Sequence, residues 1–403
     1  MSGGDGVAGE LADRSEPRYR PRFLRRPTWW AGLLSVFFLA GCACCVAIWV
    51  IYRWPRVNLP VFFFTLRPAI LWLGMALPLL AAGFVAVRPR WALTGAGLWL
   101  LCVLSNEEVF QLLRPFPERA REKFAFARKA FESFSAVDPN GGRDAEVPLR
   151  ILSWNVAAGS LDKKGVAREI AVMEPDVALI QEYDWTPSVG IGAELARTMA
   201  LRSYQRIPGR QGIVCRFPVR ELPSPYLPPW RCSVFEVDLG RRGQVIFVNV
   251  HLSARQLRAQ VLRNWTSDAL RAEMDIVQAE LEGLRKTVAL YMEKAPVVIA
   301  GDFNLPHNFV GLDFLRRTHL DAFAAKGFGW GKTVPNRWRG RRVTPILRID
   351  LIWVPKGSRV YYAAAVSTRS SDHEAVVAEV ALPALQGSGP SVRPDRHDGI
   401  LER

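Results

Sequence analysis

The sequence predicts an α/β domain that follows an apolar, membrane-embedded segment. Short apolar runs bounded by turn residues are typical of buried strands, and Val297 to Ala300, between Pro296 and Gly301, is an example. From about Leu270 to Met292, apolar residues recur at spacings of three and four, which predicts a helix that covers a sheet. Residues 29–52 carry no charged side chain and are long enough to cross a bilayer.

The charge of the chain limits its partners to anionic ones. A formal net charge of +15 favours nucleic acid, phosphate esters or an acidic membrane surface, and does not choose among them. Four of the six cysteines lie in very apolar stretches, which leaves Cys215 and Cys232 as buried strand thiols. The cysteines therefore predict no disulfide framework.

The first quarter of the chain is predicted to be a multi-pass membrane region. Residues 1–28 are rich in Gly, Pro and Arg and predict a disordered basic tail. Three apolar runs follow, which we interpret as a transmembrane region over 29–104 with spans at 29–52, 68–87 and 91–104. The third run is short, so a re-entrant or interfacial segment is the alternative. Leu39 to Cys42 also resembles a lipoprotein cleavage site, a competing interpretation.

Basic residues predict the orientation of this region. They precede the first run, and Arg88 and Arg90 separate the second from the third. By the positive-inside rule the amino terminus is cytoplasmic, and the large carboxy-terminal domain lies on the outer, periplasmic side of the cell membrane.

A juxtamembrane helix and linker are predicted for residues 105–147. Phe124, Phe131 and Phe134 recur at helical spacing, with basic residues between them. Such a helix either lies on the membrane surface with its phenylalanines inserted or packs on the following domain. We place that domain at 148–383 and a disordered tail at 384–403.

Polar side chains that suit phosphate chemistry stand at the edges of the predicted strands. They are Asn155, Glu182, His251, Asp302, Asn304, Asp350, Asp372 and His373. A carboxylate that follows a buried strand needs a partner, and a divalent cation would be one. Carboxylates can also take a proton from water, while amides and imidazoles can stabilise an oxyanion.

This ordered set resembles the endonuclease/exonuclease/phosphatase superfamily, which includes pancreatic deoxyribonuclease, and suggests a membrane-anchored bacterial-type member. The motifs are Ser-Trp-Asn155, Gln-Glu182, His251-Leu, Gly-Asp302-Phe-Asn304, Arg348-Ile-Asp350 and Ser-Asp372-His373. The resemblance covers about Pro148 to Leu382. It implies a four-layer α-β-β-α sandwich of two mixed sheets, with the site at one end of the sheets.

The resemblance also implies a role for each residue. Glu182 would bind Mg2+ (or Mn2+), assisted by Asn155 and Asp372. Asp302 would hold the attacking water, Asn304 would orient it, and His373, paired with Asp350, would stabilise the charge on the phosphoryl group. His251 would bind the phosphate or protonate the leaving oxygen, although the sequence offers no obvious acid to support it. Contacts to the substrate phosphate are expected from Ser371, Arg342 and Arg348.

We therefore predict a membrane-anchored, Mg2+-dependent hydrolase of phosphoester or phosphoanhydride bonds. Anchoring favours a lipid-linked or head-group phosphate over nucleic acid, because enzyme and substrate then share one surface. The alternative is a membrane-tethered nuclease of the same mechanism, and a remote one is an idle domain that binds anionic lipid. The exact substrate, the physiological metal, the oligomeric state and any protein partner are beyond the sequence.

Overall fold

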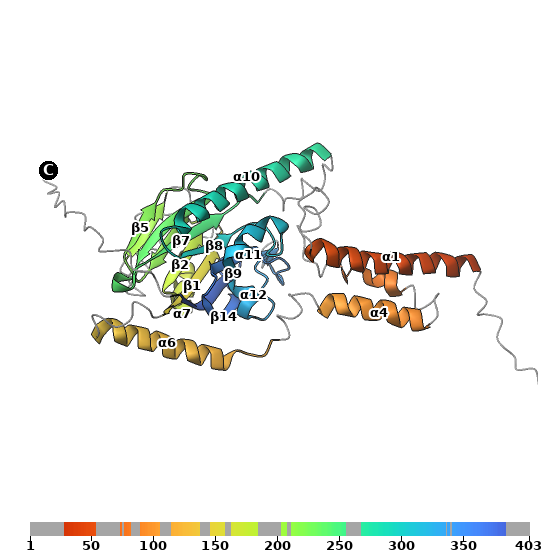
Figure 1. Cartoon of the computed structure of the whole chain (residues 1–403), viewed down its shortest axis with the longest axis horizontal. Coiled ribbons are helices and arrows are strands. Elements are labelled where there is room, and N and C mark those ends of the chain that lie inside the picture. Colours follow the sequence, from red (N-terminus) through yellow and green to blue (C-terminus); the bar gives the residue numbers. More distant parts are fainter. Residues whose placement is uncertain are drawn as a thin grey trace, which may run out of the picture.

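Two mixed β-sheets pack face to face in a computed structural model of the chain (Figure 1). The structure describes residues 28–53, 73–74, 76–81, 89–104, 114–137, 146–157, 163–183, 203–207, 211–254, 267–335, 337–338 and 341–383. The predicted tails, except for Thr28, and most of the second apolar run lie outside these residues.

The first sheet contains seven strands among the described residues. Their spatial order is β10 (Gly327–Phe328), β14 (Arg359–Val366), β15 (Ala375–Leu382), β1 (Val147–Asn155), β2 (Val177–Gln181), β4 (Gln211–Cys215) and β3 (Ser203–Ile207). The sheet is mixed because β1 pairs parallel to β2 and antiparallel to β15.

The second sheet contains six described strands. Their order is β5 (Val219–Leu222), β6 (Cys232–Asp238), β7 (Gln244–His251), β8 (Val297–Asp302), β13 (Asp350–Pro355) and β9 (His319–Asp321). It is mixed as well, since β8 pairs parallel to β7 and antiparallel to β13. A separate two-stranded ribbon joins β11 (Arg337–Trp338) to β12 (Arg341–Arg342).

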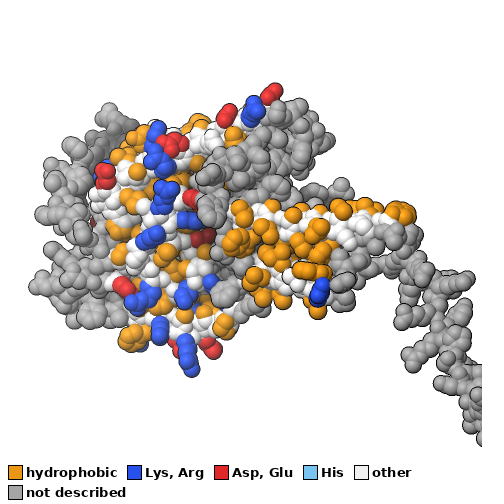
Figure 2. All heavy atoms as spheres, turned by 45° about the vertical axis from the view of Figure 1, so that its right-hand side comes forward, with side chains coloured by type: hydrophobic (Ala, Val, Ile, Leu, Met, Phe, Trp, Pro, Cys, Tyr) orange, Lys and Arg blue, Asp and Glu red, His pale blue; other side chains and the backbone are white. Residues whose placement is uncertain are grey.

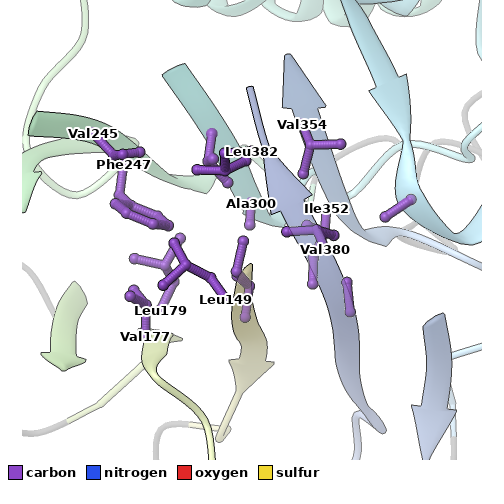
Figure 3. Close-up of a cluster of buried hydrophobic side chains, with 14 of the residues drawn as sticks. Leu149, Val177, Leu179, Val245, Phe247, Ala300, Ile352, Val354, Val380 and Leu382 are labelled. Atoms are coloured by element: carbon purple, nitrogen blue, oxygen red, sulfur yellow. The ribbon is translucent and has the colours of Figure 1, made fainter. Parts of the chain in front are cut away.

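Apolar side chains from both sheets fill the space between them (Figure 3). Leu149, Val177 and Leu179 of the first sheet belong to the same buried cluster as Phe247 and Ile352 of the second. Successive side chains of a strand point to opposite faces, so the other residues of these strands face outward and need a cover of their own. This explains why the strands read as continuous apolar runs.

Helices supply the two outer layers, and the predicted four-layer sandwich is confirmed. Helix α7 (Lys163–Met173) covers the first sheet through Val166, Ala167 and Ile170. Helix α10 (Ser267–Met292) covers the second sheet, in agreement with the predicted 270–292 helix. The second sheet is also covered by the 3-10 turn η4 (Val310–Leu312) and α11 (Asp313–Thr318).

Helix α6 (Glu118–Val137), which the sequence predicted as a juxtamembrane helix, packs on the outer face of the first sheet, the second of its two predicted arrangements. Phe124 is 1% exposed and packs on Tyr361, at a ring separation of 5.7 Å. Further along the helix, Arg128 forms a 2.8 Å ion pair with Asp176. Nothing is described of the Phe131 and Phe134 side chains.

The segment before α6 also contacts the domain. Arg114 donates hydrogen bonds of 2.8 and 3.2 Å to the backbone oxygens of Ala324 and Gly327, at the end of α12 (Ala322–Lys326). An arginine at a helix carboxyl end satisfies carbonyls that the helix leaves open. The segment from residue 114 onward is therefore part of the folded domain.

The apolar region forms an arm outside the sandwich (Figures 1 and 2). Its helices α1 (Thr28–Arg53) and α4 (Pro89–Leu104) lie side by side, and hydrophobic side chains cover the surface that they present (Figure 2). Of the three predicted spans, only α1 is long and apolar enough among the described residues to cross a membrane. Residues 73–74 and 76–81 of the second run are helical, and α4 is shorter.

The two helices of the arm run in the same direction. Phe38 packs on Gly95, and Cys102 Sγ lies 3.9 Å from the backbone oxygen of Cys45. An earlier residue of α1 thus contacts an earlier residue of α4, and a later residue contacts a later one. Trp99 of α4 also donates a 2.9 Å hydrogen bond to the backbone oxygen of Leu73.

Candidate active site

The strand ends of both sheets meet at one edge of the sandwich. In the first sheet, Asn155 is paired with Gln181, directly before Glu182. In the second sheet, Asp302 is paired with His251 on one side and with Asp350 on the other. Parallel strands end at the same edge, so residues far apart in sequence come together there.

Asp302 lies at the centre of this cluster and is 1% exposed. Its Oδ1 accepts a hydrogen bond from the backbone N–H of Asn304 at 2.8 Å, and its Oδ2 accepts one from Asn155 Nδ2 at 3.0 Å. Burial, together with the nearby charge of Asp350, raises the pKa of Asp302 to about 6. A carboxylate with that pKa can take a proton from water near neutral pH.

Asp350 and His373 form a buried ion pair beside Asp302. The Nδ1 atom of His373 lies 3.0 and 3.2 Å from the two carboxylate oxygens of Asp350. Its other ring nitrogen, Nε2, lies 4.0 Å from Asp302 Oδ2. Burial lowers the pKa of His373, but the charge and hydrogen bond of Asp350 outweigh it and raise the pKa to about 10. The ring is therefore an imidazolium at neutral pH, aimed at Asp302.

His251 is paired with Glu182, an acidic partner that the sequence did not reveal. Glu182 Oε1 lies 3.3 Å from His251 Nε2 and also accepts a 3.0 Å hydrogen bond from Asn155 Nδ2. The two residues come from different sheets, which is why no sequence spacing pointed to the pair. The amide of Asn155 thus bridges Glu182 and Asp302.

Two positions after the strands have backbone angles that L-residues rarely adopt. Glu182 has φ +55° and Asn304 has φ +52°. Asn304 is held there by hydrogen bonds from its side chain to the backbone oxygen of Leu252 at 2.9 Å and from its backbone to Asp302. Such outliers persist where the surrounding structure over-determines them, often at functional sites. Both side chains are thereby turned toward the cluster.

Gly301 allows β7 and β8 to approach at the site. Its φ is +150°, and a Cβ added there would overlap the backbone oxygen of Val250. Only glycine tolerates this close approach, which brings His251 beside Asp302.

The predicted phosphate-binding residues have different surroundings. The guanidinium of Arg348 is buried, and its Nη1 donates hydrogen bonds of 2.8 and 2.9 Å to Asp321. Arg348, which we predicted to contact the substrate phosphate, thus forms a buried ion pair with Asp321. Ser371 is also buried, and its hydroxyl donates to the backbone oxygen of Asn155 at 2.7 Å and accepts from the His373 backbone at 3.0 Å.

Two predicted residues remain at the surface of the site. Arg342 has 56% of its side chain exposed and lies 3.7 Å from Glu374, next to His373. Asp372 is exposed, whereas its neighbours Ser371 and His373 are buried. Arg342 is thus the predicted arginine that is accessible to a bound phosphate.

Sequence reasoning missed the residues that hold the site in place. Gln181 of the first sheet donates a 2.7 Å hydrogen bond to Asn249 of the second, and both are fully buried directly below the site. On the outer side, Glu280 of α10 accepts hydrogen bonds from Ser253 at 2.5 and 3.0 Å and pairs with Arg231 at 3.0 Å. The sequence did contain a signal for Gln181 and Asn249, because each is a polar residue in an otherwise apolar strand.

The cluster has the donor set of a divalent-cation site. Among the described residues, Asp302, Asp350 and His373 place ligand atoms within 4.8 Å of one another. His373 is already paired with Asp350 as an imidazolium, so the oxygens of the cluster would be the ligands. Carboxylate oxygens are the ligands that Mg2+ prefers, and a cation would offset the repulsion between two buried carboxylates. Glu182 and the side-chain oxygen of Asn155 lie at the same edge, so the residues present fit such an ion.

Comparison with known proteins identifies the family. The sequence model of the Endonuclease/Exonuclease/phosphatase family matches residues 152–373. This chain belongs to that family. The match spans the segment from β1 to His373, which contains every residue of the cluster. Family members hydrolyse phosphoester bonds and are generally dependent on divalent metals. No curated protein matches the chain.

Several solved structures are similar to this chain at low identity. An endonuclease/exonuclease/phosphatase from Bacteroides vulgatus is 14% identical, with a TM-score of 0.44, and the match covers 59% of this chain and 99% of that one. The mannosyl-6-phosphatase of Bacteroides thetaiotaomicron is 18% identical, with a TM-score of 0.40 and coverage of 58% and 99%. A 3'-5' exonuclease from Neisseria meningitidis is 18% identical, with a TM-score of 0.42 and coverage of 57% and 99%.

Proposed function

We propose that the chain is a membrane-anchored, Mg2+-dependent phosphohydrolase that acts on a lipid-linked or head-group phosphate. The observation that carries this proposal is the position of the apolar arm relative to the site. The arm ends at Leu104, and ten residues later Arg114 is bonded to the end of α12.

The direction of α6 supports this arrangement. Near its middle, Arg128 contacts Asp176, which precedes β2, whereas the site lies after β2 at Glu182. Helix α6 therefore leads away from the site edge, and it begins on the side of the domain where the arm lies (Figure 1). A site held next to its own anchor meets lipid-borne substrate at high effective concentration.

The proposed mechanism assigns each step to a residue of the cluster. Asp302 accepts a proton from a water that attacks phosphorus, and Asn304 orients that water. The His373 imidazolium, kept protonated by Asp350, stabilises the negative charge on the phosphoryl oxygens. As the phosphorus–oxygen bond breaks, His251, held by Glu182, gives a proton to the leaving oxygen.

A divalent cation would complete this charge balance. Glu182 and Asn155 would hold it, with Asp372 at the exposed margin. When bound, the ion polarises the phosphoryl oxygens and neutralises developing negative charge.

A substrate screen tests the proposal. The full chain, reconstituted in vesicles with Mg2+, is offered lipid phosphates, lipid pyrophosphates, sphingomyelin, inositol phosphates and plasmid DNA. We expect release of phosphate or of a phosphorylated head group from lipid, and loss of this activity with EDTA. Cleavage of DNA at full rate with every lipid left intact would instead establish the tethered nuclease.

A pair of variants tests the assigned residues. Glu182→Gln should abolish turnover and leave the melting temperature unchanged, because a carboxylate at a metal site contributes chemistry more than packing. Glu282→Gln is the matched control, since Glu282 is an exposed residue of α10 that pairs only with its helix neighbours in the described structure. Near wild-type rates for Glu182→Gln at saturating Mg2+ would remove Glu182 from the metal site.

A further inference from the structure

Exposed aromatic, aliphatic and basic side chains lie on both sides of the catalytic cluster. Trp230 is 55% exposed and is followed by Arg231, whose backbone oxygen accepts a 2.9 Å hydrogen bond from the N–H of His251. Ile346 is 47% exposed, and Leu347, next to it, bridges to Val334 in the segment that leads into β13. We call Trp230, Trp330, Arg341 and Ile346 the rim residues.

The strand order places the rim residues around the site. Trp230 precedes β6, and Trp330, Arg341 and Ile346 precede β13, while β7 and β8 run between them with His251 and Asp302 at their ends. Three strand spacings of about 4.8 Å separate β6 from β13. Both loops are at the catalytic edge, since β6 begins beside Val250 and β13 begins beside Asp302.

The second loop is held firmly. Trp330 donates a 2.6 Å hydrogen bond from its indole nitrogen to the backbone oxygen of Pro345, directly before Ile346. The backbone oxygen of Thr333 accepts a 2.9 Å hydrogen bond from Glu374, next to His373. Its apolar side chains are therefore presented to solvent by a bonded loop attached to the site.

We propose that the rim residues form a contact surface for an anionic bilayer, so that the catalytic edge faces the membrane. This inference rests on the proposed function for its substrate. Trp230, Trp330 and Ile346 would enter the interface, where indole rings are favoured, and Arg341 would contact anionic head groups. Three features argue for a bilayer: the arm joins at this edge, its surface is apolar, and Lys and Arg side chains gather on the adjoining face of the domain (Figure 2).

Lipid contact can be measured without knowing the substrate. Trp230→Cys and Ile346→Cys are made one at a time in a full chain whose six native cysteines are replaced by alanine. Each cysteine carries an environment-sensitive fluorophore, after reconstitution in phosphatidylcholine vesicles with or without phosphatidylglycerol. Spin-labelled lipids should quench both labels, more strongly with phosphatidylglycerol. Val172→Cys is the control, because Val172 is 84% exposed and lies on α7 just before β2, at the opposite end of the sheets.

Activity gives a second measurement. Trp230→Ala should slow hydrolysis of the lipid substrate about tenfold, which corresponds to losing the burial of one large apolar side chain. Hydrolysis of soluble bis(4-nitrophenyl) phosphate should be unchanged, which also shows that the variant is folded. For the charge, Arg341→Gln should weaken the phosphatidylglycerol effect, and Arg359→Gln should not, since Arg359 begins β14 beside Glu146, away from the site.

Each failure has a distinct result. Labels at 230 and 346 that stay as accessible to water as the label at 172 would overturn the bilayer contact, even if lipid is hydrolysed. Quenched labels in a chain that cleaves only DNA would overturn the lipid substrate and leave the contact surface standing.

Discussion

At the scale of single residues, the chemistry depends on two like charges held close together. Asp302 and Asp350 face each other across paired strands, and both are 1% exposed. Two carboxylates in one buried site cannot both ionise freely, and the positive charge of His373 offsets their repulsion. Asp350 thereby raises both pKa values, that of Asp302 by repulsion and that of His373 by attraction.

These shifts predict a bell-shaped pH dependence of kcat/KM. In the proposed mechanism Asp302 acts as a carboxylate, so activity should rise as pH passes upward through its pKa of about 6. His373 acts as an imidazolium, so activity should fall as pH passes its pKa of about 10. In Asp350→Asn both pKa values fall, and the descending limb should move toward neutral pH with a rate loss of about a hundredfold.

The control for this profile is Asp275→Asn, on an exposed position of α10. It should leave both limbs in place. A descending limb that does not move in Asp350→Asn would show that His373 is not the group that must stay protonated.

The polar residues could be predicted from the sequence because each lies at the edge of an apolar strand. Asn155, His251 and Asp302 all occupy strand ends, and strand ends meet at one edge of a sheet. What could not be predicted is which residues pair across the two sheets. The Glu182–His251 contact and the burial of Arg348 against Asp321 both depend on how the sheets and loops stack, which no local spacing encodes.

At the scale of elements, α6 illustrates the limit of amphipathic patterns. Its phenylalanine spacing fits a membrane surface and a protein surface equally well, because both bury an apolar stripe. The deciding feature is charge pairing: Arg121 lies 3.4 Å from Glu379, and Arg128 contacts Asp176, both on the domain. We therefore propose that the folded unit begins near Arg114, before the boundary at 148 that the sequence suggested.

This packing predicts a large difference between two neighbouring phenylalanines. Phe124→Ala should destabilise the domain by about 3 kcal/mol, because it removes a fully buried ring that packs on Tyr361. Phe126→Ala should have little effect, since Phe126 is 78% exposed on the same helix. Thermal melting and protease cleavage of α6 in the detergent-solubilised chain measure both. Equal effects of the two substitutions would mean that α6 does not dock through Phe124.

At the scale of the whole molecule, the arm and the sandwich are both rich in apolar residues but differ in how these residues are covered. In the sandwich, apolar runs are covered on both faces, by the other sheet and by helices. In the arm, α1 leaves Trp29, Leu33, Val36 and Trp49 exposed, although each would favour burial. Exposed apolar surface of this extent marks a membrane or a partner. The long uncharged runs of the arm therefore allowed the sequence to distinguish it from the sandwich domain.

The sidedness of the membrane is the last prediction. Because α1 and α4 run in the same direction, a returning segment must lie between them, and the described helical residues of the second run contact both. If the arm makes the three predicted passes, the amino terminus and the domain lie on opposite sides, and the basic residues before α1 predict that the amino terminus is cytoplasmic. Reporter fusions at Asp138 and at the carboxy terminus should therefore both give the signal of the outer, periplasmic side. A fusion between residues 82 and 88 should give the cytoplasmic signal as the internal control. Cytoplasmic signal at Asp138 and at the carboxy terminus would mean two passes or an inverted arm, and it would favour nucleotide or nucleic-acid substrates, which are abundant on that side.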